Sequence, residues 1–189
     1  MEKQKKLDQN PLLKRFKNCR KEQSKDSYRP LYHYINPEGN LNDPNGLCFW
    51  QGRRHLFYQA YPPEDPRQCW GHALSTDLIH WENLPLAIYP NPEEKCFSGQ
   101  TLVEHNRVIA AYQGINFGLI IAISDPLLLS WEKLKINSID ATTRQSTKRP
   151  MEDACIWKER EYYYVLSGGK RGKGTKRKRI ERLHRSKTL

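Results

Sequence analysis

The sequence reads STDLIHWENL at residues 75–84 and SDPLLLSWEKL at residues 124–134. The two tryptophans of this repeat, Trp81 and Trp131, lie 50 residues apart. A repeat of this length in a chain of short strands is typical of the blades of a β-propeller. A β-sandwich also has many short strands, but nothing in a sandwich requires an aligned repeat, so the propeller is favoured.

Short runs of β-branched and aromatic residues recur from residue 28 to residue 167, and clusters of Gly, Pro, Asn and Asp separate them. This is the pattern of strands joined by turns, and no long helical period interrupts it. Gln51-Gly52 predicts a hairpin turn. The chain is therefore expected to be all-β. The predicted strands are Leu47–Trp50, His55–Gln59, His72–Ser75, Gln100–Val103, Val108–Gln113, Leu119–Ser124, Ala154–Lys158 and Tyr162–Ser167.

A second set of short polar segments recurs at a similar interval, close to the start of three predicted strands. The segments are Asn42-Asp43-Pro44, Ser98-Gly99 and Glu152-Asp153-Ala154. In a propeller, the first strands of neighbouring blades surround the axis, so we expect the carboxylates of Asp43 and Asp153 to approach one another there. A third copy of the repeat begins at residues 185–189 and lacks its tryptophan, which predicts about two and a half blades, a fragment of a closed propeller.

The formal net charge of +11 is spread unevenly over the 189 residues. Residues 1–30 carry +6 and residues 168–189 carry +9, whereas residues 31–167 carry −4. The basic character thus belongs to the two ends, and the centre is mildly acidic. Within that centre, Glu93 and Glu94 are expected to lie in a solvated turn.

The domain boundaries follow this change of composition. Residues 1–27 are predicted to be a basic extension, disordered or with a short amphipathic helix that begins near Pro11. Residues 28–189 are predicted to be the propeller part. Within it, residues 168–182 are expected to form a basic, loop-like segment.

The basic segment leaves an alternative open. Runs such as Lys176-Arg177-Lys178-Arg179 occur in nuclear localisation signals and in nucleic-acid-binding proteins. The neighbouring glycines do not form the phosphate-binding pattern GxxxxGK[ST]. We therefore favour a solvated basic loop and expect no nucleic-acid partner, and a basic nucleic-acid-binding protein is kept as the less favoured alternative.

The five cysteines are odd in number, form no C-x-x-C pair and lack the spacing of a zinc site. Free thiols in a reducing compartment are therefore expected, and no metal. No apolar run approaches 18 residues, so we expect no membrane span. The first 30 residues lack the apolar core of a secretory signal, which predicts a cytoplasmic protein. The cysteines are Cys19, Cys48, Cys69, Cys96 and Cys155.

The densest cluster of chemistry-bearing residues is HYINPEGNLNDPNG at residues 33–46. A turn alone would account for the NDPNG at its end. A turn does not account for the aromatic and amide-bearing segments that follow, which are Phe57-Tyr58-Gln59, Trp70-Gly71-His72 and Phe97-Ser98-Gly99. Aromatic faces beside Asn, Gln and Asp side chains suit a sugar, because a sugar presents apolar C–H faces and many hydroxyl groups.

Taken together, these segments resemble glycoside hydrolase family 32, the β-fructosidases that include invertases, sucrose-6-phosphate hydrolases, levanases and inulinases. Residues 33–46 resemble the family signature that ends in NDPNG. The resemblance covers about residues 28–167, and it implies a five-bladed β-propeller followed by a β-sandwich, of which this chain is the N-terminal part. Further similarity follows in order, with HLFYQ at 55–59, WGHALSTDLIHW at 70–81, LPLAI at 84–88 and CFSG at 96–99.

The resemblance implies a role for each residue that matches the family pattern. Asp43 would be the nucleophile that attacks the fructosyl anomeric carbon, and Asp153 would stabilise the transition state. Trp70 lies in the family's WGH segment, where a sugar contact and a packing role both stay open. No cofactor or metal is implied. The substrate-binding residues implied are Asn42, Gln59, Trp70, Phe97 and Ser98.

Two departures from the family pattern bear on activity. The family's RDP motif reads Glu152-Asp153-Ala154 here, so a negative charge replaces the arginine beside the aspartate. The family's general acid/base is a Glu in an EC pair, and the sequence contains no Glu-Cys pair. Retaining hydrolysis needs two carboxyl groups roughly 5–5.5 Å apart. We therefore expect the 189-residue chain to be a weakly active or inactive fragment.

The implied function is hydrolysis of terminal β-fructosyl bonds, in sucrose or its 6-phosphate, with retention of configuration. A small fructoside is the expected partner. The alternative is a non-catalytic fructoside-binding propeller in which Glu152 marks lost chemistry.

Overall fold

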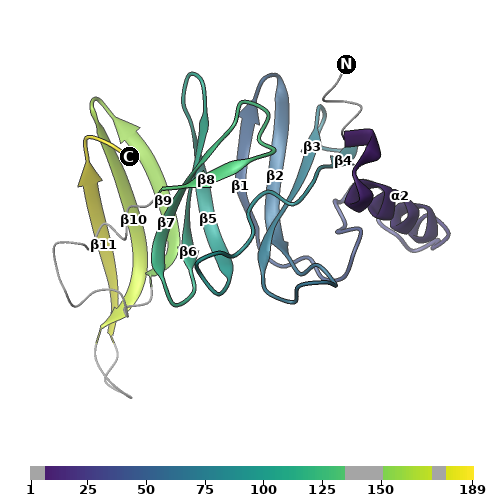
Figure 1. The fold of residues 1–189 in the computed structure, drawn as a ribbon, viewed down its shortest axis with the longest axis horizontal. Helices are drawn as coiled ribbons and strands as arrows, with labels where there is room; N and C mark the ends of the chain where they lie inside the picture. The colour runs from purple at the N-terminus through teal and green to yellow at the C-terminus, as the bar shows by residue number, and fades with distance from the viewer. Residues whose placement is uncertain (1–6, 135–150, 172–177) are drawn as a thin grey trace.

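A computed structural model describes residues 7–134, 151–171 and 178–189 of the chain. Within these ranges the strands form three antiparallel sheets, which follow one another along the long axis of the molecule (Figure 1). The first sheet holds β1 (Pro44–Trp50), β2 (Arg53–Ala60), β3 (Cys69–Ser75) and β4 (Trp81–Asn83). The second holds β5 (Cys96–Val103), β6 (Val108–Gly114), β7 (Gly118–Ser124) and β8 (Trp131–Lys133). The third holds β9 (Met151–Glu159), β10 (Tyr162–Arg171) and β11 (Lys178–Ser186).

Each sheet is a meander in which consecutive strands pair. The first strands of the three sheets also lie beside one another, because β1 contacts β5 and β5 contacts β9. Two four-stranded sheets and a three-stranded sheet in this arrangement confirm the all-β prediction and the estimate of about two and a half blades. Within the described residues, no helix has the length and apolar character needed to cross a membrane.

The sequence repeat corresponds to a repeated turn between the third and fourth strands. In each copy an aspartate, Asp77 or Asp125, accepts backbone N–H groups from the following turn at 2.7–3.0 Å. The leucine three residues before each tryptophan has a positive φ, 66° in the first copy and 57° in the second. The indole N–H of Trp81 or Trp131 donates to the carbonyl of that leucine. The repeat therefore encodes the turn that brings the short strands β4 and β8 onto their sheets.

All eight predicted strands are present, and the Gln51-Gly52 turn joins β1 to β2 with positive φ at both residues. The strands β4 and β8 were not predicted, because three residues are too few to show an alternating pattern.

The expected loop at residues 168–182 is wrong for the residues that the structure describes. Residues 168–171 continue β10, and residues 178–182 belong to β11. The two strands pair antiparallel, with Gly168 opposite Glu181 and Ser167 opposite Arg182, so the backbone groups with which they face each other are satisfied within the sheet. Basic residues suit an edge strand, which has one paired neighbour, because they discourage further pairing. A basic composition therefore fits an edge strand as well as a solvated loop, and composition alone indicated the loop. Residues 172–177 lie outside the described ranges.

The helix expected near Pro11 is α2 (Pro11–Gln23). Asn10 caps it by accepting the backbone N–H of Leu12 at 2.9 Å, and the proline occupies the first turn, where its missing N–H costs nothing. Phe16 is buried against Tyr58 and other apolar residues of the first sheet, and Figure 1 shows the helix beside that sheet. The basic extension is thus packed against the propeller part rather than separate from it.

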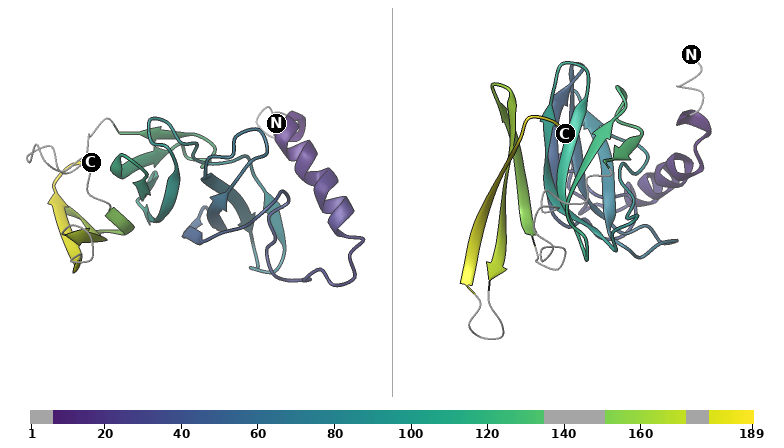
Figure 2. Two further views of the ribbon diagram at one scale, coloured as in Figure 1. Left: turned by 90° about the horizontal axis from the view of Figure 1, so that it is seen from below. Right: turned by 60° about the vertical axis from the view of Figure 1, so that its left-hand side comes forward.

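Two apolar clusters join the sheets. The first lies between the first and second sheets and contains Phe57 and Trp70 together with Tyr112 and Leu128. The second joins β6 and β7 to β9 and β10. Figure 2 shows the yellow-green strands of the third sheet beside the green strands of the second. These clusters fix the first strands relative to one another, and those strands carry the predicted site residues.

Candidate active site

Three of the predicted site residues meet in one hydrogen-bonded group. Asp43 lies just before β1, and its Oδ2 accepts a hydrogen bond from Ser98 Oγ at 2.8 Å and from Gln59 Nε2 at 3.2 Å. Gln59 Nε2 also donates to Ser98 Oγ at 2.7 Å. Among the described residues, none donates to the other carboxylate oxygen, Oδ1, and Asp43 is exposed. The group therefore fixes one oxygen of Asp43 and leaves the second one accessible.

The backbone explains why these side chains meet. The N–H of Asn42 donates to the carbonyl of Gln59, and the N–H of Gln59 donates to the carbonyl of Asp43. These bonds extend the β1–β2 pairing to the two residues that precede β1, and they hold Asp43 beside Gln59. Ser98 arrives from β5, the first strand of the second sheet.

Each of the three first strands also has an irregular register close to a predicted site residue. Register shifts occur between Asn45 and Cys48 in β1, between Cys96 and Gly99 in β5, and opposite residues 166–168 in β9. An extra residue in a strand bends it and redirects a side chain, which is why such bulges are common beside active sites. Gly99 is also required in β5, because a Cβ there would lie 2.2 Å from the carbonyl oxygen of Ala111.

Asp153 lies on β9 with φ at 48°, a conformation that non-glycine residues rarely adopt, and its side chain is exposed. The first strand of the second sheet, β5, separates β9 from β1. Within the described part of the chain, no hydrogen bond joins Asp153 to the group formed by Asp43, Gln59 and Ser98.

Trp70 corrects one predicted role. Its side chain is fully buried, so it does not offer a surface to a sugar. Its indole N–H donates to the backbone carbonyl of Phe97 at 2.9 Å, and its ring packs in the cluster between the first two sheets. Of the two roles left open by the sequence, Trp70 has the packing role, and it positions the backbone next to Ser98. Phe97 itself is partly exposed beside the site.

Asn42 is held by residues that sequence analysis did not identify. Its Nδ2 donates to the hydroxyl of Tyr61 at 2.9 Å, and that hydroxyl donates to Gln68 Oε1 at 2.7 Å. Tyr61 and Gln68 lie in the segment between β2 and β3, which has no strand pattern and no family motif. The sequence therefore contained no signal for them.

Two buried histidines lie in the core of the first sheet. His55 Nδ1 and His72 Nε2 are 2.9 Å apart, and Phe57 stacks on the ring of His72. Burial, with a smaller contribution from Arg53, lowers the pKa of His55 to about 4. Burial also lowers the pKa of His72 well below its usual value. Both rings are therefore neutral in the folded chain, and a ring N–H of one donates to the other.

This pair predicts that stability falls on acidification. A histidine in the unfolded chain binds a proton near pH 6.5, whereas His55 resists protonation until about pH 4. The unfolded state thus gains protons first, and stability decreases as the pH falls below about 6.5. We expect His55 to contribute a loss on the order of 2 kcal/mol between pH 7 and pH 5, measured from urea unfolding midpoints. His55→Gln should make that loss smaller, and His105→Gln, at an exposed position, should not.

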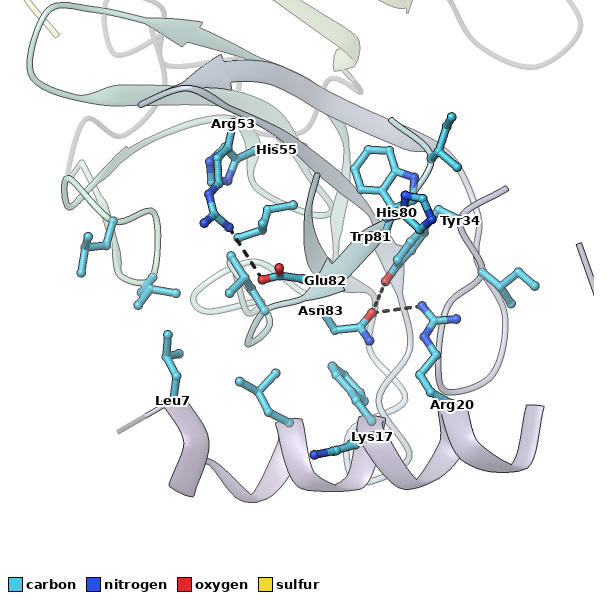
Figure 3. A pocket seen from close by; sticks show the side chains of 18 of the residues that line it. Leu7, Lys17, Arg20, Tyr34, Arg53, His55, His80, Trp81, Glu82 and Asn83 are labelled. Carbon is cyan, nitrogen blue, oxygen red and sulfur yellow. Dashed lines mark hydrogen bonds and ion pairs between the residues drawn. The ribbon is translucent and has the colours of Figure 1, made fainter. Parts of the chain in front are cut away.

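A cleft of about 1100 Å³ lies elsewhere, between α2 and the outer part of the first sheet (Figure 3). Arg20 of α2 donates to Asn83 Oδ1 at 3.1 Å, and the hydroxyl of Tyr34 donates to the same oxygen at 2.9 Å. None of the predicted site residues lines this cleft. Within the described residues, no three His, Cys, Asp or Glu side chains cluster as they would around a metal ion.

Comparison with known proteins identifies the family. Residues 33–187 match the model of the glycosyl hydrolases family 32 N-terminal domain. The chain belongs to glycoside hydrolase family 32. Membership of this family explains the order of the NDPNG, WGH and FSG segments. It also explains the two four-stranded blades and the three strands of a third blade among the described residues.

Several family 32 proteins are similar to the chain. A fructan 6-exohydrolase of Beta vulgaris is 37% identical over 161 residues, which cover 77% of the chain and 26% of that protein. A levanase of Bacillus subtilis is 34% identical and is covered to 24%, against 77% of the chain. The structure of a sucrose-6-phosphate hydrolase from Lactobacillus gasseri aligns over 92% of the chain and 37% of its own, with a TM-score of 0.72 and 26% identity. The chain thus spans about a quarter of the length of the two curated relatives.

The structure of one relative has been solved with a sugar bound. A mutant of a Bombyx mori family 32 β-fructofuranosidase has been solved in complex with sucrose, and it aligns over 95% of the chain and 40% of its own with a TM-score of 0.70 and 29% identity. These matches establish a partial family 32 propeller as the fold of the chain.

Proposed function

We propose that the chain carries the fructosyl-binding part of a retaining β-fructofuranosidase site, with Asp43 as the nucleophile. The observation that carries this proposal is the geometry of the Asp43 carboxylate. Ser98 and Gln59 fix Oδ2, and Oδ1 is exposed without a donor from the described residues. A carboxylate held in this way presents one oxygen to an anomeric carbon in a fixed direction, which favours attack.

The chemistry that follows has two steps. In the first, Asp43 Oδ1 forms a bond to the anomeric carbon of the fructosyl unit while the bond to the leaving oxygen breaks. In the second, water replaces Asp43 at that carbon and releases fructose, so the configuration is retained overall. Asn42, Gln59, Ser98 and Phe97 are proposed to contact the sugar. Asp153 is proposed to stabilise the transition state from β9.

The proposal assigns no general acid to these 189 residues, because the sequence has no Glu-Cys pair. General acid–base help is worth roughly 10²–10⁴-fold in rate. On natural fructosides, whose leaving groups need a proton, the chain alone is therefore proposed to be weakly active or inactive. Terminal β-fructosides such as sucrose, its 6-phosphate and fructans are the proposed substrate class. Its five free cysteines suit the reducing, cytoplasmic environment that we also propose.

The test is release of fructose from sucrose and from levan by the purified chain, beside an Asp43→Ala variant. We expect release that is lower than that of a full-length family 32 enzyme by at least about 10²-fold, and none with the variant. Rapid turnover that depends on Asp43 would contradict the proposed weakness of the chain. Turnover that survives Asp43→Ala would contradict the role of Asp43.

A non-catalytic fructoside-binding role is the second candidate, and Glu152 favours it. A carboxylate beside Asp153 replaces the donor that the family arginine would offer to the sugar. Saturable fructoside binding without any covalent fructosyl adduct would support this candidate over the enzyme.

A further inference from the structure

Asn42 is connected to the second sheet by a continuous chain of three hydrogen bonds. Asn42 Nδ2 donates to the hydroxyl of Tyr61, which donates to Gln68 Oε1. Gln68 Nε2 in turn donates to the backbone carbonyl of Cys96 at 3.0 Å. Gln68 is only 3% exposed, so its amide has no access to bulk water as an alternative partner.

The direction of every bond in this chain is determined by its last member. A backbone carbonyl only accepts, so the nitrogen of the Gln68 amide must face Cys96. The oxygen of the same amide then faces Tyr61, and the Tyr61 hydroxyl must donate to it. That hydroxyl has donated its only proton, so its oxygen accepts from the nitrogen of the Asn42 amide. The remaining polar atom, Asn42 Oδ1, is an acceptor.

The same anchor also positions the strand that carries Ser98. The N–H of Cys96 donates to the carbonyl of Gln68 at 2.9 Å, so the two residues are joined by both backbone and side chain. Ser98 follows two residues later and donates to Asp43. The orientation of the Asn42 amide and the placement of Ser98 are therefore fixed by one buried residue.

We propose that Tyr61 and Gln68 are positioning residues that orient the Asn42 amide with its oxygen toward the bound sugar. The inference rests on the proposed function. The site then selects a sugar hydroxyl that donates a hydrogen bond at this point. An analogue in which that hydroxyl is replaced by hydrogen or by fluorine leaves Asn42 Oδ1 without a donor, so the site should bind the analogue more weakly than the sugar.

The tyrosine hydroxyl is the member of the chain that can be removed with least disturbance. Tyr61→Phe keeps the ring and breaks both bonds of the hydroxyl, so the Asn42 amide is free to rotate. A hydrogen bond of this kind contributes roughly 0.5–1.5 kcal/mol, which corresponds to about a 2- to 12-fold change in affinity. We expect the dissociation constant for methyl β-fructofuranoside to rise by about that factor. The preference for the sugar over its deoxy analogue should fall equally.

The experiment is a double-mutant cycle on the full 189-residue chain. Dissociation constants for methyl β-fructofuranoside and its monodeoxy and fluoro analogues are measured by NMR titration for wild type, Tyr61→Phe, Asn42→Ala and the double variant. If Tyr61 acts through Asn42, Tyr61→Phe has no further effect once Asn42 is alanine. Tyr32→Phe is the matched control, because Tyr32 is exposed. Urea midpoints establish that all variants fold.

Each outcome decides at least one of two claims, the positioning role of Tyr61 and the proposed function. Independent, additive effects of the two substitutions would overturn the positioning role of Tyr61, as would unchanged affinity and selectivity in Tyr61→Phe. No binding of the fructoside by the wild-type chain would overturn the proposed function itself, and the present inference with it. A selective loss in Tyr61→Phe that vanishes in the Asn42→Ala background supports both.

Discussion

A chain with asparagine in place of Asp43 is expected to release no nitrophenolate from a β-fructofuranoside that carries nitrophenol as its leaving group. The wild-type chain, in contrast, is expected to release about one equivalent in a burst. Nitrophenolate departs without a proton, so the first step needs the nucleophile and dispenses with a general acid. The second step needs a base to activate water, so the fructosyl group should accumulate on Asp43.

The expected size of the effect follows from the role of the residue. Loss of a catalytic nucleophile removes the whole covalent route, and we expect the burst rate to fall by on the order of 10³-fold or more. Asparagine preserves the shape of the side chain and an oxygen that accepts from Ser98, so the fold should be unaffected. Intact-protein mass spectrometry should find one fructosyl adduct in the wild type and none in Asp43→Asn.

A second carboxylate serves as the control for this measurement. Asp26 is exposed, lies in the segment after α2 and belongs to none of the strands that carry the site. Asp26→Asn should leave the burst unchanged. An equal burst from Asp43→Asn would show that another group attacks the sugar, and the proposed assignment would then be wrong.

The sequence predicted the parts of the fold that repeat. Trp81 and Trp131 are 50 residues apart because each closes the same turn, in which an aspartate caps backbone N–H groups and the indole binds the preceding carbonyl. Such a turn needs specific residue types at fixed spacing, so it leaves a mark in the sequence. Residues 178–182 of β11 are held by backbone pairing with β10, which requires no particular residue types, so they leave no such mark.

The candidate site was predictable in the same uneven way. Asp43, Gln59 and Ser98 were named from short segments, and the structure joins their side chains. Tyr61 and Gln68 could not be named, because a hydrogen-bonded chain between residues in an irregular segment requires no pattern of residue types. Trp70 shows the reverse limit. Trp70 belongs to a group of aromatic and amide-bearing residues that suits a sugar, but the sequence does not indicate whether its ring is exposed to a ligand or buried.

Glu93 is the clearest error of the sequence analysis, and it supports the second large prediction. It was expected in a solvated turn, yet it is 1% exposed. Its Oε1 accepts from Lys133 Nζ at 2.6 Å, from the hydroxyl of Tyr112 at 2.7 Å and from the thiol of Cys96 at 3.1 Å. Burial opposes ionisation, but these donors together hold the pKa of Glu93 below its usual value. The carboxylate is therefore charged, and Lys133 is its ion-pair partner.

Lys133→Met is expected to destabilise the chain by about 3–5 kcal/mol at pH 8, because it leaves the buried Glu93 carboxylate without its counter-charge. Lys133 also donates to the carbonyls of Tyr89 and Asn91, so the segment that enters β5 loses its attachment to β8. Urea unfolding measures the loss. Lys25→Met, which removes an exposed pair with Glu22, should cost no more than about 1 kcal/mol.

The pH dependence separates a lost charge pair from lost packing. Without Lys133, burial favours the neutral form of Glu93, so its pKa should rise above the usual value for a glutamate. Acidification then protonates the carboxyl group in the folded variant, and the cost of Lys133→Met should shrink between pH 8 and pH 5. Adding Glu93→Gln should recover much of the loss at pH 8, since the uncompensated charge is gone. A cost that is the same at both pH values, and that Glu93→Gln does not reduce, would mean that the lysine side chain acts through packing and its carbonyl contacts. The β5 segment that carries Phe97 and Ser98 would then depend on the shape of this buried group rather than on its charge.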